Sequence, residues 1–296
     1  MSSDPIARVP LDWPERHLSR SILVGKLQWH VQVGGSGPVV LLLHGTGGSS
    51  HCWARVVPEV LGHATVVVPD LPGHGFTRGA APVDLSLPGI AAALKALLQS
   101  LQLPAPDLLV GHSAGAALAI RWALDSVQSS AVPVIGFNPA LIAPPRSYLE
   151  MLAPLVHPIA TSSWTARMVA RVARNTPLVD RLVASTGSRL DAAQLHCYRV
   201  LFANPDHVRG ALGLMAAADL PNLVERGAEL GAALSLVLAR GDRWLPEPRL
   251  LSVIKRSFPS AAVRHWEGGH LIPETAQSST ARFILEVLSG QRATTH

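Results

Sequence analysis

One short stretch, residues 108–115 (Leu-Leu-Val-Gly-His-Ser-Ala-Gly), constrains the fold of this chain more than any other. An apolar run typical of a buried strand leads into a turn centred on Ser113, and the Ala-rich residues 114–124, which favour a helix, follow directly. So tight a turn strains the serine backbone and leaves room only for glycine two residues to either side, where Gly111 and Gly115 stand. Backbone N–H groups at a helix start have no partner within the helix and can stabilise negative charge. We therefore predict that Ser113 is a nucleophile.

A serine hydroxyl is a weak nucleophile near neutral pH and needs a histidine base, which in turn needs an acidic residue to orient it. Two candidate partners follow strand-like runs further along the chain. Asp242 comes after residues 234–240, and His270 comes after residues 262–266. The chain has 13 histidines, so the position after the last strand is what singles out His270. The sequence thus predicts a triad of Ser113, Asp242 and His270.

The first strong strand, residues 38–43, ends in a glycine-rich loop, residues 44–48 (His-Gly-Thr-Gly-Gly). Such glycines let backbone N–H groups point into a site, so we expect the N–H groups of Thr46 and Ala114 to form an oxyanion hole. We interpret His44 as a brace of this loop, held by hydrogen bonds, rather than as a proton-transfer residue. The residues expected to surround the binding site are His44, Gly45, Gly47 and His112.

Strand-like and helix-like segments alternate, which predicts an α/β fold with a doubly wound, mostly parallel sheet and ligands at the carboxyl ends of its strands. In residues 141–220 the alternation stops, and short helices interrupted by prolines predict an inserted helical lid that sets substrate choice. The predicted division is core 1–140, lid 141–220 and core 221–296. The expected strands are 21–24, 27–33, 38–43, 65–68, 107–110, 132–137, 234–240 and 262–266, and the expected longer helices are 51–61, 87–103, 114–124, 248–258 and 275–288.

Composition limits the classes of function. Of 296 residues 48% are apolar, ample for one large core. The net charge of +5 rests on only 15% charged residues with no dense Lys/Arg tract, which argues against nucleic acid and leaves an anionic membrane surface or an acidic substrate as partners. Cys52 and Cys197 lack metal-ligand or redox spacing, and no phosphate-binding loop is present, so we expect free thiols, no metal and no cofactor. We expect a cytoplasmic protein, soluble or peripheral on the inner membrane surface, because no signal peptide or spanning segment is evident.

Within the lid, residues 164–174 are typical of an amphipathic helix, with Trp164, Met168 and Val172 on one face and Arg167, Arg171 and Arg174 on another. The favoured interpretation is a solvated basic face above an ordinary apolar contact. The alternative is a basic helix that touches a membrane or binds carboxylates. The methionines of the lid fill gaps in its core or, less favoured, soften a pocket for a flat apolar ligand; they are Met151, Met168 and Met215.

The triad and the His44-Gly45 loop resemble the α/β-hydrolase superfamily across nearly the whole chain. A narrower resemblance is to the magnesium chelatase accessory proteins of bacteriochlorophyll synthesis. It rests on residues 12–14 (Asp-Trp-Pro), 27–32 (Leu-Gln-Trp-His-Val-Gln), 44–47 (His-Gly-Thr-Gly) and 69–77 (Pro-Asp-Leu-Pro-Gly-His-Gly-Phe-Thr). This resemblance implies a role around magnesium insertion into protoporphyrin, with protoporphyrin or magnesium protoporphyrin as ligand and magnesium chelatase subunits as partners.

From the residues alone, the chemistry is acyl transfer to water, with His270 as base and Asp242 holding its tautomer. Ser113 excludes the relatives that place an aspartate nucleophile at this turn, such as haloalkane dehalogenases and epoxide hydrolases. Two hypotheses stay open. In one, the protein is an active serine hydrolase on a small apolar carboxylic ester, amide or ketone. In the other, which we favour, it is a porphyrin-binding accessory factor that retains the triad, and the sequence does not decide whether turnover occurs.

Overall fold

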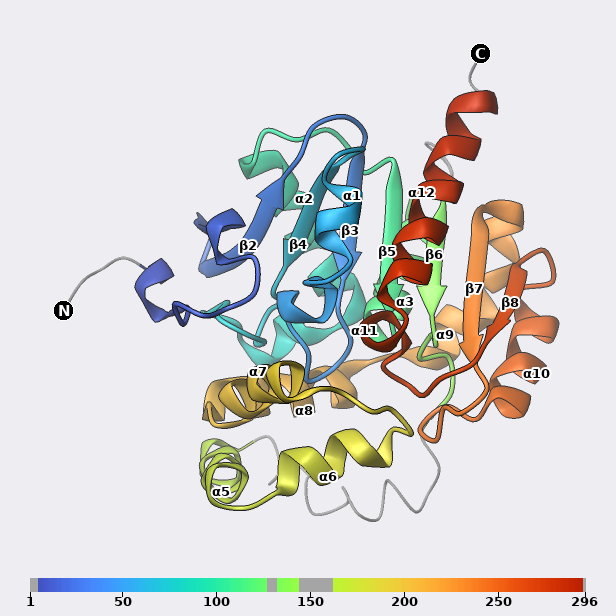
Figure 1. Ribbon diagram of the computed structural model, residues 1–296. Coiled ribbons are helices and arrows are strands. Elements are labelled where there is room, and N and C mark those ends of the chain that lie inside the picture. Colours follow the sequence, from blue (N-terminus) through green and yellow to red (C-terminus); the bar gives the residue numbers. More distant parts are fainter. Residues whose placement is uncertain (1–4, 127–131, 144–161, 295–296) are drawn as a thin grey trace.

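A single eight-stranded sheet organises the computed structural model, which describes residues 5–126, 132–143 and 162–294 (Figure 1). The strand order is β1-β2-β4-β3-β5-β6-β7-β8. β2 runs antiparallel to β1 and to β4, and all other neighbours are parallel, so the predicted mostly parallel α/β fold is confirmed. The strands are β1 Ser19–Val24, β2 Leu27–Gly34, β3 Val39–Leu43, β4 Thr65–Pro69, β5 Leu108–His112, β6 Val134–Phe137, β7 Leu234–Ala239 and β8 Ala262–Trp266.

Both faces of the central strands are buried, as their continuous Val/Leu runs predict. In β3 the side chains of Leu41 and Leu43 join one apolar cluster, while Val40 and Leu42 join another on the opposite face. Helices α2, α3 and α10 contribute to the first cluster, and α1 and α12 to the second. These helices span α1 Val57–Val60, α2 Leu87–Ser100, α3 Ala114–Leu124, α10 Glu247–Ser257 and α12 Gln277–Thr294, and α11, Ile272–Thr275, precedes α12.

Further helices lie between β6 and β7 in the sequence and form a separate layer at the end of the sheet toward which the arrowheads of β5 and β6 point (Figure 1). They fall in the segment predicted as a lid, and that role stays a prediction. Met151, which is predicted to fill a gap in the lid core, lies outside the described residues. The helices of this layer are α5 Ser163–Asn175, α6 Leu178–Ser185, α7 Ala192–Phe202 and α8 Pro205–Ala217. A further helix, α9 Leu220–Glu225, follows the predicted segment and packs on α3 and α10.

The favoured interpretation of α5 is wrong. Trp164 is 63% exposed, and Met168 and Val172 are each 42% exposed, so this face makes no buried apolar contact. The helix packs through small side chains instead, with Ala166 and Ala170 buried in one cluster with residues of α8. Small residues let two helix backbones approach closely, which leaves the larger apolar side chains outside. The exposed surface of α5 is therefore both basic and apolar.

The helix expected at residues 51–61 is divided in two, and the helix expected at residues 275–288 is preceded by a short separate helix. Residues 51–61 form a 3-10 helix, Ser50–Trp53, and then α1, which carries Pro58 in its first turn. Proline lacks a backbone N–H and fits the start of a helix but not its interior, so a new helix begins there. Pro273 has the same effect at the start of α11, before the longer α12. Within the described residues, no helix has the length and apolarity needed to cross a bilayer.

Candidate active site

Ser113 stands in a strained turn between β5 and α3, with φ 52° and ψ −116°. The positive φ places it in a region of backbone conformation where residues other than glycine are rare. A Cβ on Gly111 would lie 2.3 Å from the carbonyl oxygen of Gly115, and a Cβ on Gly115 would lie 2.3 Å from that of Leu43. Both flanking glycines are therefore required by close backbone contacts, as the motif predicts.

The structure brings Ser113, His270 and Asp242 together from the ends of β5, β8 and β7. His270 Nε2 lies 3.0 Å from Ser113 Oγ, and His270 Nδ1 lies 2.7 Å from Asp242 Oδ2. The other carboxylate oxygen, Asp242 Oδ1, accepts hydrogen bonds from the backbone N–H groups of Trp244 (2.8 Å) and Leu245 (2.9 Å). With both oxygens engaged, the carboxylate has one orientation, which favours the His270 tautomer that carries its proton on Nδ1.

The backbone of His270 is fixed from three sides. Its carbonyl oxygen accepts hydrogen bonds from Asn138 Nδ2 (2.9 Å) and His112 Nε2 (2.8 Å), and its N–H donates to Thr186 O (3.0 Å). Trp244 stacks on the imidazole ring with centroids 5.6 Å apart. Sequence reasoning placed His112 near the site without a role and missed Asn138, Thr186 and Trp244. The position of Asn138, directly after β6, is the one signal that could have indicated it.

Thr46 and Ala114, the predicted oxyanion donors, line one cavity together with Ser113. Among the described residues, no hydrogen-bond acceptor is found for the backbone N–H of Thr46 or Ala114. A Cβ on Gly45 would lie 3.0 Å from the Cβ of Ser113, so the loop passes directly beside the serine. Gly47 has φ 76°, a conformation that favours glycine. Thr46 in this loop and Ala114 at the start of α3 therefore remain the predicted oxyanion donors.

His44 uses both ring nitrogens on the backbone. Its Nδ1–H donates to Gly45 O (2.8 Å), and its Nε2 accepts from the N–H of Leu71 (2.9 Å). Burial lowers the pKa of His44 to about 3, with the nearby His74 as a second cause, so the ring is neutral near pH 7. These contacts support the interpretation of His44 as a brace of the loop.

Two further buried histidines, missed by sequence reasoning, continue this bracing. His207 of α8 accepts a hydrogen bond at Nδ1 from the N–H of Gly75 (3.0 Å), and its Nε2–H donates to Gly47 O (3.2 Å). Its ring packs edge-on against His74, which in turn lies 5.2 Å from the ring of His44. Burial lowers the pKa of His74 to about 4 and that of His207 well below its ordinary value. A neutral histidine cluster therefore links the glycine-rich loop to α8.

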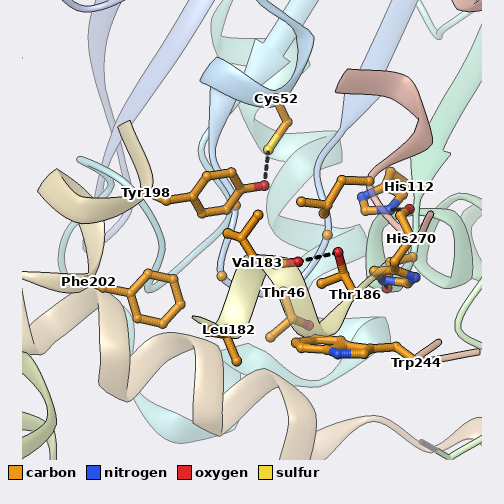
Figure 2. A pocket seen from close by; sticks show the side chains of 15 residues that line it. Thr46, Cys52, His112, Leu182, Val183, Thr186, Tyr198, Phe202, Trp244 and His270 are labelled. Carbon is orange, nitrogen blue, oxygen red and sulfur yellow. Dashed lines mark hydrogen bonds between the residues drawn. The ribbon is translucent and has the colours of Figure 1, made fainter. Parts of the chain in front are cut away.

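Apolar cavities meet at the serine. Ser113 lines one cavity of about 70 Å³ and another of about 110 Å³, and a third of about 250 Å³ adjoins them at Thr46 and Trp244. Figure 2 shows Trp244 and His270 on one side of the first cavity and Tyr198 and Phe202, both from α7, on the other. Met215 lines the second and third cavities. Helices α6–α8 thus supply much of the wall around the serine.

The sheet, the strained serine turn and the flanking helices define an α/β hydrolase. The chain belongs to the alpha/beta hydrolase family, whose sequence model matches residues 40–283.

Within this family, the chain is 36% identical to the magnesium-chelatase 30 kDa subunit of Rhodobacter capsulatus, over 97% of this chain and 100% of that protein. It is 26% identical to a fluoroacetate dehalogenase from Burkholderia sp., over 94% of this chain and 95% of the relative. A solved α/β hydrolase fold protein from Burkholderia ambifaria superposes with a TM-score of 0.72, covering 90% of this chain and 99% of the other at 20% identity, a likeness of fold alone. The resemblance to the α/β-hydrolase superfamily and to the magnesium chelatase accessory proteins is confirmed.

Proposed function

We propose that the protein is an accessory factor for magnesium insertion into protoporphyrin in bacteriochlorophyll synthesis, built on a serine-hydrolase site. The observation that carries this proposal is the 36% identity to a magnesium-chelatase 30 kDa subunit over the full length of that protein. Similarity of this extent covers the core and the α5–α8 layer alike. The partners that follow from it are magnesium chelatase subunits, with protoporphyrin or magnesium protoporphyrin as ligand.

The third cavity suits an apolar ring that carries carboxylates. Its wall is mostly apolar and includes Arg181 of α6, for which no ion pair is found among the described residues. Apolar area buried in such a cavity stabilises a complex by ~25 cal/mol per Å², while an exposed Arg–carboxylate pair contributes about 0–1 kcal/mol. Ring burial therefore dominates the proposed affinity, and Arg181 orients a propionate.

The experiment is a fluorescence or absorbance titration of protoporphyrin and magnesium protoporphyrin against the purified protein. We expect a Kd below about 100 μM for one of them. Met215→Trp, which fills the cavities, is expected to weaken binding at least tenfold, and Arg181→Ala only a few-fold. Absence of binding to both porphyrins in the folded protein contradicts the proposed ligand.

A second candidate function is favoured by the assembled geometry at Ser113: hydrolysis of a small apolar carboxylic ester, amide or ketone. His270 Nε2 takes the Ser113 proton as Oγ bonds to the carbonyl carbon, and the N–H groups of Thr46 and Ala114 stabilise the oxyanion. For an ester or amide, the imidazolium returns the proton to the leaving group. Water then adds to the acyl enzyme with His270 as base, and the acid product and free serine are released.

A fluorophosphonate probe tests this chemistry separately from porphyrin binding. Labelling should disappear in Ser113→Ala and fall strongly in His270→Ala, while Ser289→Ala, at an exposed serine of α12, is the matched control. Unlabelled wild type means that the triad is a scaffold. Turnover of an aryl ester without porphyrin binding favours the hydrolase over the accessory factor.

We also propose a peripheral contact between α5 and an anionic membrane. The exposed Trp164 and Met168 suit insertion at a lipid interface, and the neighbouring Arg167 and Arg171 suit its negative charge. The net charge of +5 acts in the same direction. α6 follows α5 and lines the third cavity, so an apolar ligand would enter close to the bilayer.

A further inference from the structure

Three side chains that the proposed reaction does not use meet behind one wall of the active-site cavity. His51 and Cys52 belong to the 3-10 helix that follows the glycine-rich loop, and Glu274 belongs to α11, just after His270. Their ligand-type atoms lie within 4.8 Å of one another, and all three residues are buried. They stand on segments far apart in the chain, so no spacing motif in the sequence could indicate the cluster.

Neighbouring groups orient these side chains. Ser49 Oγ lies 2.7 Å from His51 Nδ1, and when Nδ1–H donates to Ser49, the lone pair on Nε2 faces Cys52 Sγ at 3.9 Å. Glu274 Oε1 accepts a hydrogen bond from the Tyr198 hydroxyl (2.6 Å). The second carboxylate oxygen, Glu274 Oε2, is buried without a hydrogen-bond partner among the described residues. A buried polar atom left unpaired is costly, so this oxygen points to a ligand.

We propose that His51, Cys52 and Glu274 bind a divalent transition-metal cation, with Zn²⁺ the best match. Thiolate, imidazole and carboxylate are the ligand types of Zn²⁺, and Tyr198 or a water completes a tetrahedron. One thiolate and one carboxylate balance the two charges of the cation, so the buried site is neutral overall. Binding releases the thiol proton and any proton on the carboxyl group. Mg²⁺ prefers oxygen ligands alone, so this is not a magnesium site.

The residues around the cluster show how a cation could reach it and what its binding would do to the active site. A cavity of about 190 Å³ is lined by His51, Cys52 and Glu274 and gives a cation room to enter. Cys52 and Tyr198 also line the active-site cavity, where Figure 2 shows them side by side. The cation would join the segment after the glycine-rich loop to the segment after His270, and so clamp together the two loops that carry the oxyanion donor and the base.

The test is a Co²⁺ titration of the full chain after removal of metals with a chelator. We expect saturation at a single Co²⁺ per chain with a near-ultraviolet thiolate-to-cobalt band, displaced by Zn²⁺ but not by Mg²⁺. Cys52→Ser should abolish the band. Cys197→Ser is the matched control, because it changes the other cysteine of the chain, which lines the same 190 Å³ cavity, and the band should persist.

Two further readouts separate ligation from folding. Ser49→Ala, which removes the outer partner of His51, should weaken Co²⁺ binding about tenfold or more while far-ultraviolet circular dichroism stays that of wild type. Zn²⁺ should raise the Tm of wild type but not that of Cys52→Ser. A folded wild type without a cobalt band, a band that survives in Cys52→Ser, or equal loss in Cys197→Ser overturns the site. Ser113→Ala should bind Co²⁺ normally, so this test is independent of the proposed function.

Discussion

His112 Nε2 donates a hydrogen bond to the carbonyl oxygen of His270 over 2.8 Å, so the residue next to the serine holds the backbone of the residue that faces it. Burial lowers the pKa of His112 well below its ordinary value, with the nearby His270 as the second cause, so His112 stays neutral with its proton on Nε2. Ser113 and His270 are thus linked through His112 as well as by their own hydrogen bond.

We expect His112→Ala to lower the rate of fluorophosphonate labelling about tenfold, the effect of one lost hydrogen bond of 1 to 1.5 kcal/mol. Asn138 donates to the same carbonyl, so a double variant with Asn138→Ala should lose more than the product of the two single effects. Labelling kinetics of the four proteins give the coupling. Strictly multiplicative effects would show that the two donors act independently.

Asp242→Asn should lower labelling on the order of 10⁴-fold without unfolding the protein. An amide can offer only one acceptor oxygen, whereas Asp242 accepts from His270 on one side and from the N–H groups of Trp244 and Leu245 on the other. If the amide NH2 faces His270, the imidazole must carry its proton on Nε2. If it faces the N–H groups of Trp244 and Leu245, these lose their acceptor and the loop must shift. Asp206→Asn, at an exposed aspartate of α8, is the control. A normal rate in Asp242→Asn would remove this residue from the site.

Gly47→Ala is expected to weaken labelling several-fold and to cost about 1–2 kcal/mol of stability. Its φ of 76° is strained for alanine, and the new Cβ would lie 3.1 Å from Phe202 Cζ. The loop that carries the Thr46 N–H must then shift. Gly62→Ala serves as the control, because its Cβ meets nothing within 4 Å. Equal behaviour of the two variants would show that the loop conformation does not matter.

The buried histidines should make the protein sensitive to acid. Because the folded pKa values of His44 (about 3) and His74 (about 4) lie below the ordinary 6.5, their stabilising contribution is complete above pH 6.5 and is lost as pH falls toward 4. By pH 4 each of the two histidines has lowered the free energy of unfolding by on the order of 3 kcal/mol. Burial raises the pKa of Glu274 to about 7, an opposite contribution that the more numerous histidines outweigh. Thermal melts across this range should show a steep fall in Tm, and a flat profile would contradict it.

Binding to anionic vesicles should require both sides of the α5 surface. Arg167→Glu and Arg171→Glu should each cost at least about 1 kcal/mol of membrane affinity, and added salt should weaken the binding of wild type. Trp164→Ala should also reduce sedimentation with vesicles, whereas Leu23→Ala, an equally exposed apolar residue on β1 (65%), should not. Equal binding to neutral and anionic lipid, or none to either, excludes this contact.

The strands and the positions that follow them could be predicted because local patterns determine them. The continuous Val/Leu run of β3 and the glycines around Ser113 specify burial and turn geometry from neighbouring residues alone. The partners of His270 could not be predicted in this way. These partners are Asn138, Thr186 and Trp244. They contact His270 only because strands pair and α6 packs as it does, and no spacing in the sequence predicts this. The exposure of Trp164 was mispredicted for a related reason, since the amphipathic pattern does not say which face of α5 finds a neighbour.

The backbone of Ser113 is held by parts of the chain that follow it. Its N–H donates to Phe137 O (2.9 Å), and its carbonyl oxygen accepts from the N–H of Ala140 (3.1 Å), and both of these residues come after α3 in the sequence. An unfolded or half-assembled chain has nothing to hold a positive φ at this serine, so the residue relaxes to an ordinary conformation. During refolding, α3 can form before β6, β7 and β8 join the sheet. The positive φ of Ser113 cannot be held until they have done so. The hydrogen bond between Ser113 and His270 therefore forms only once β8 has joined the sheet and brought His270 to the serine.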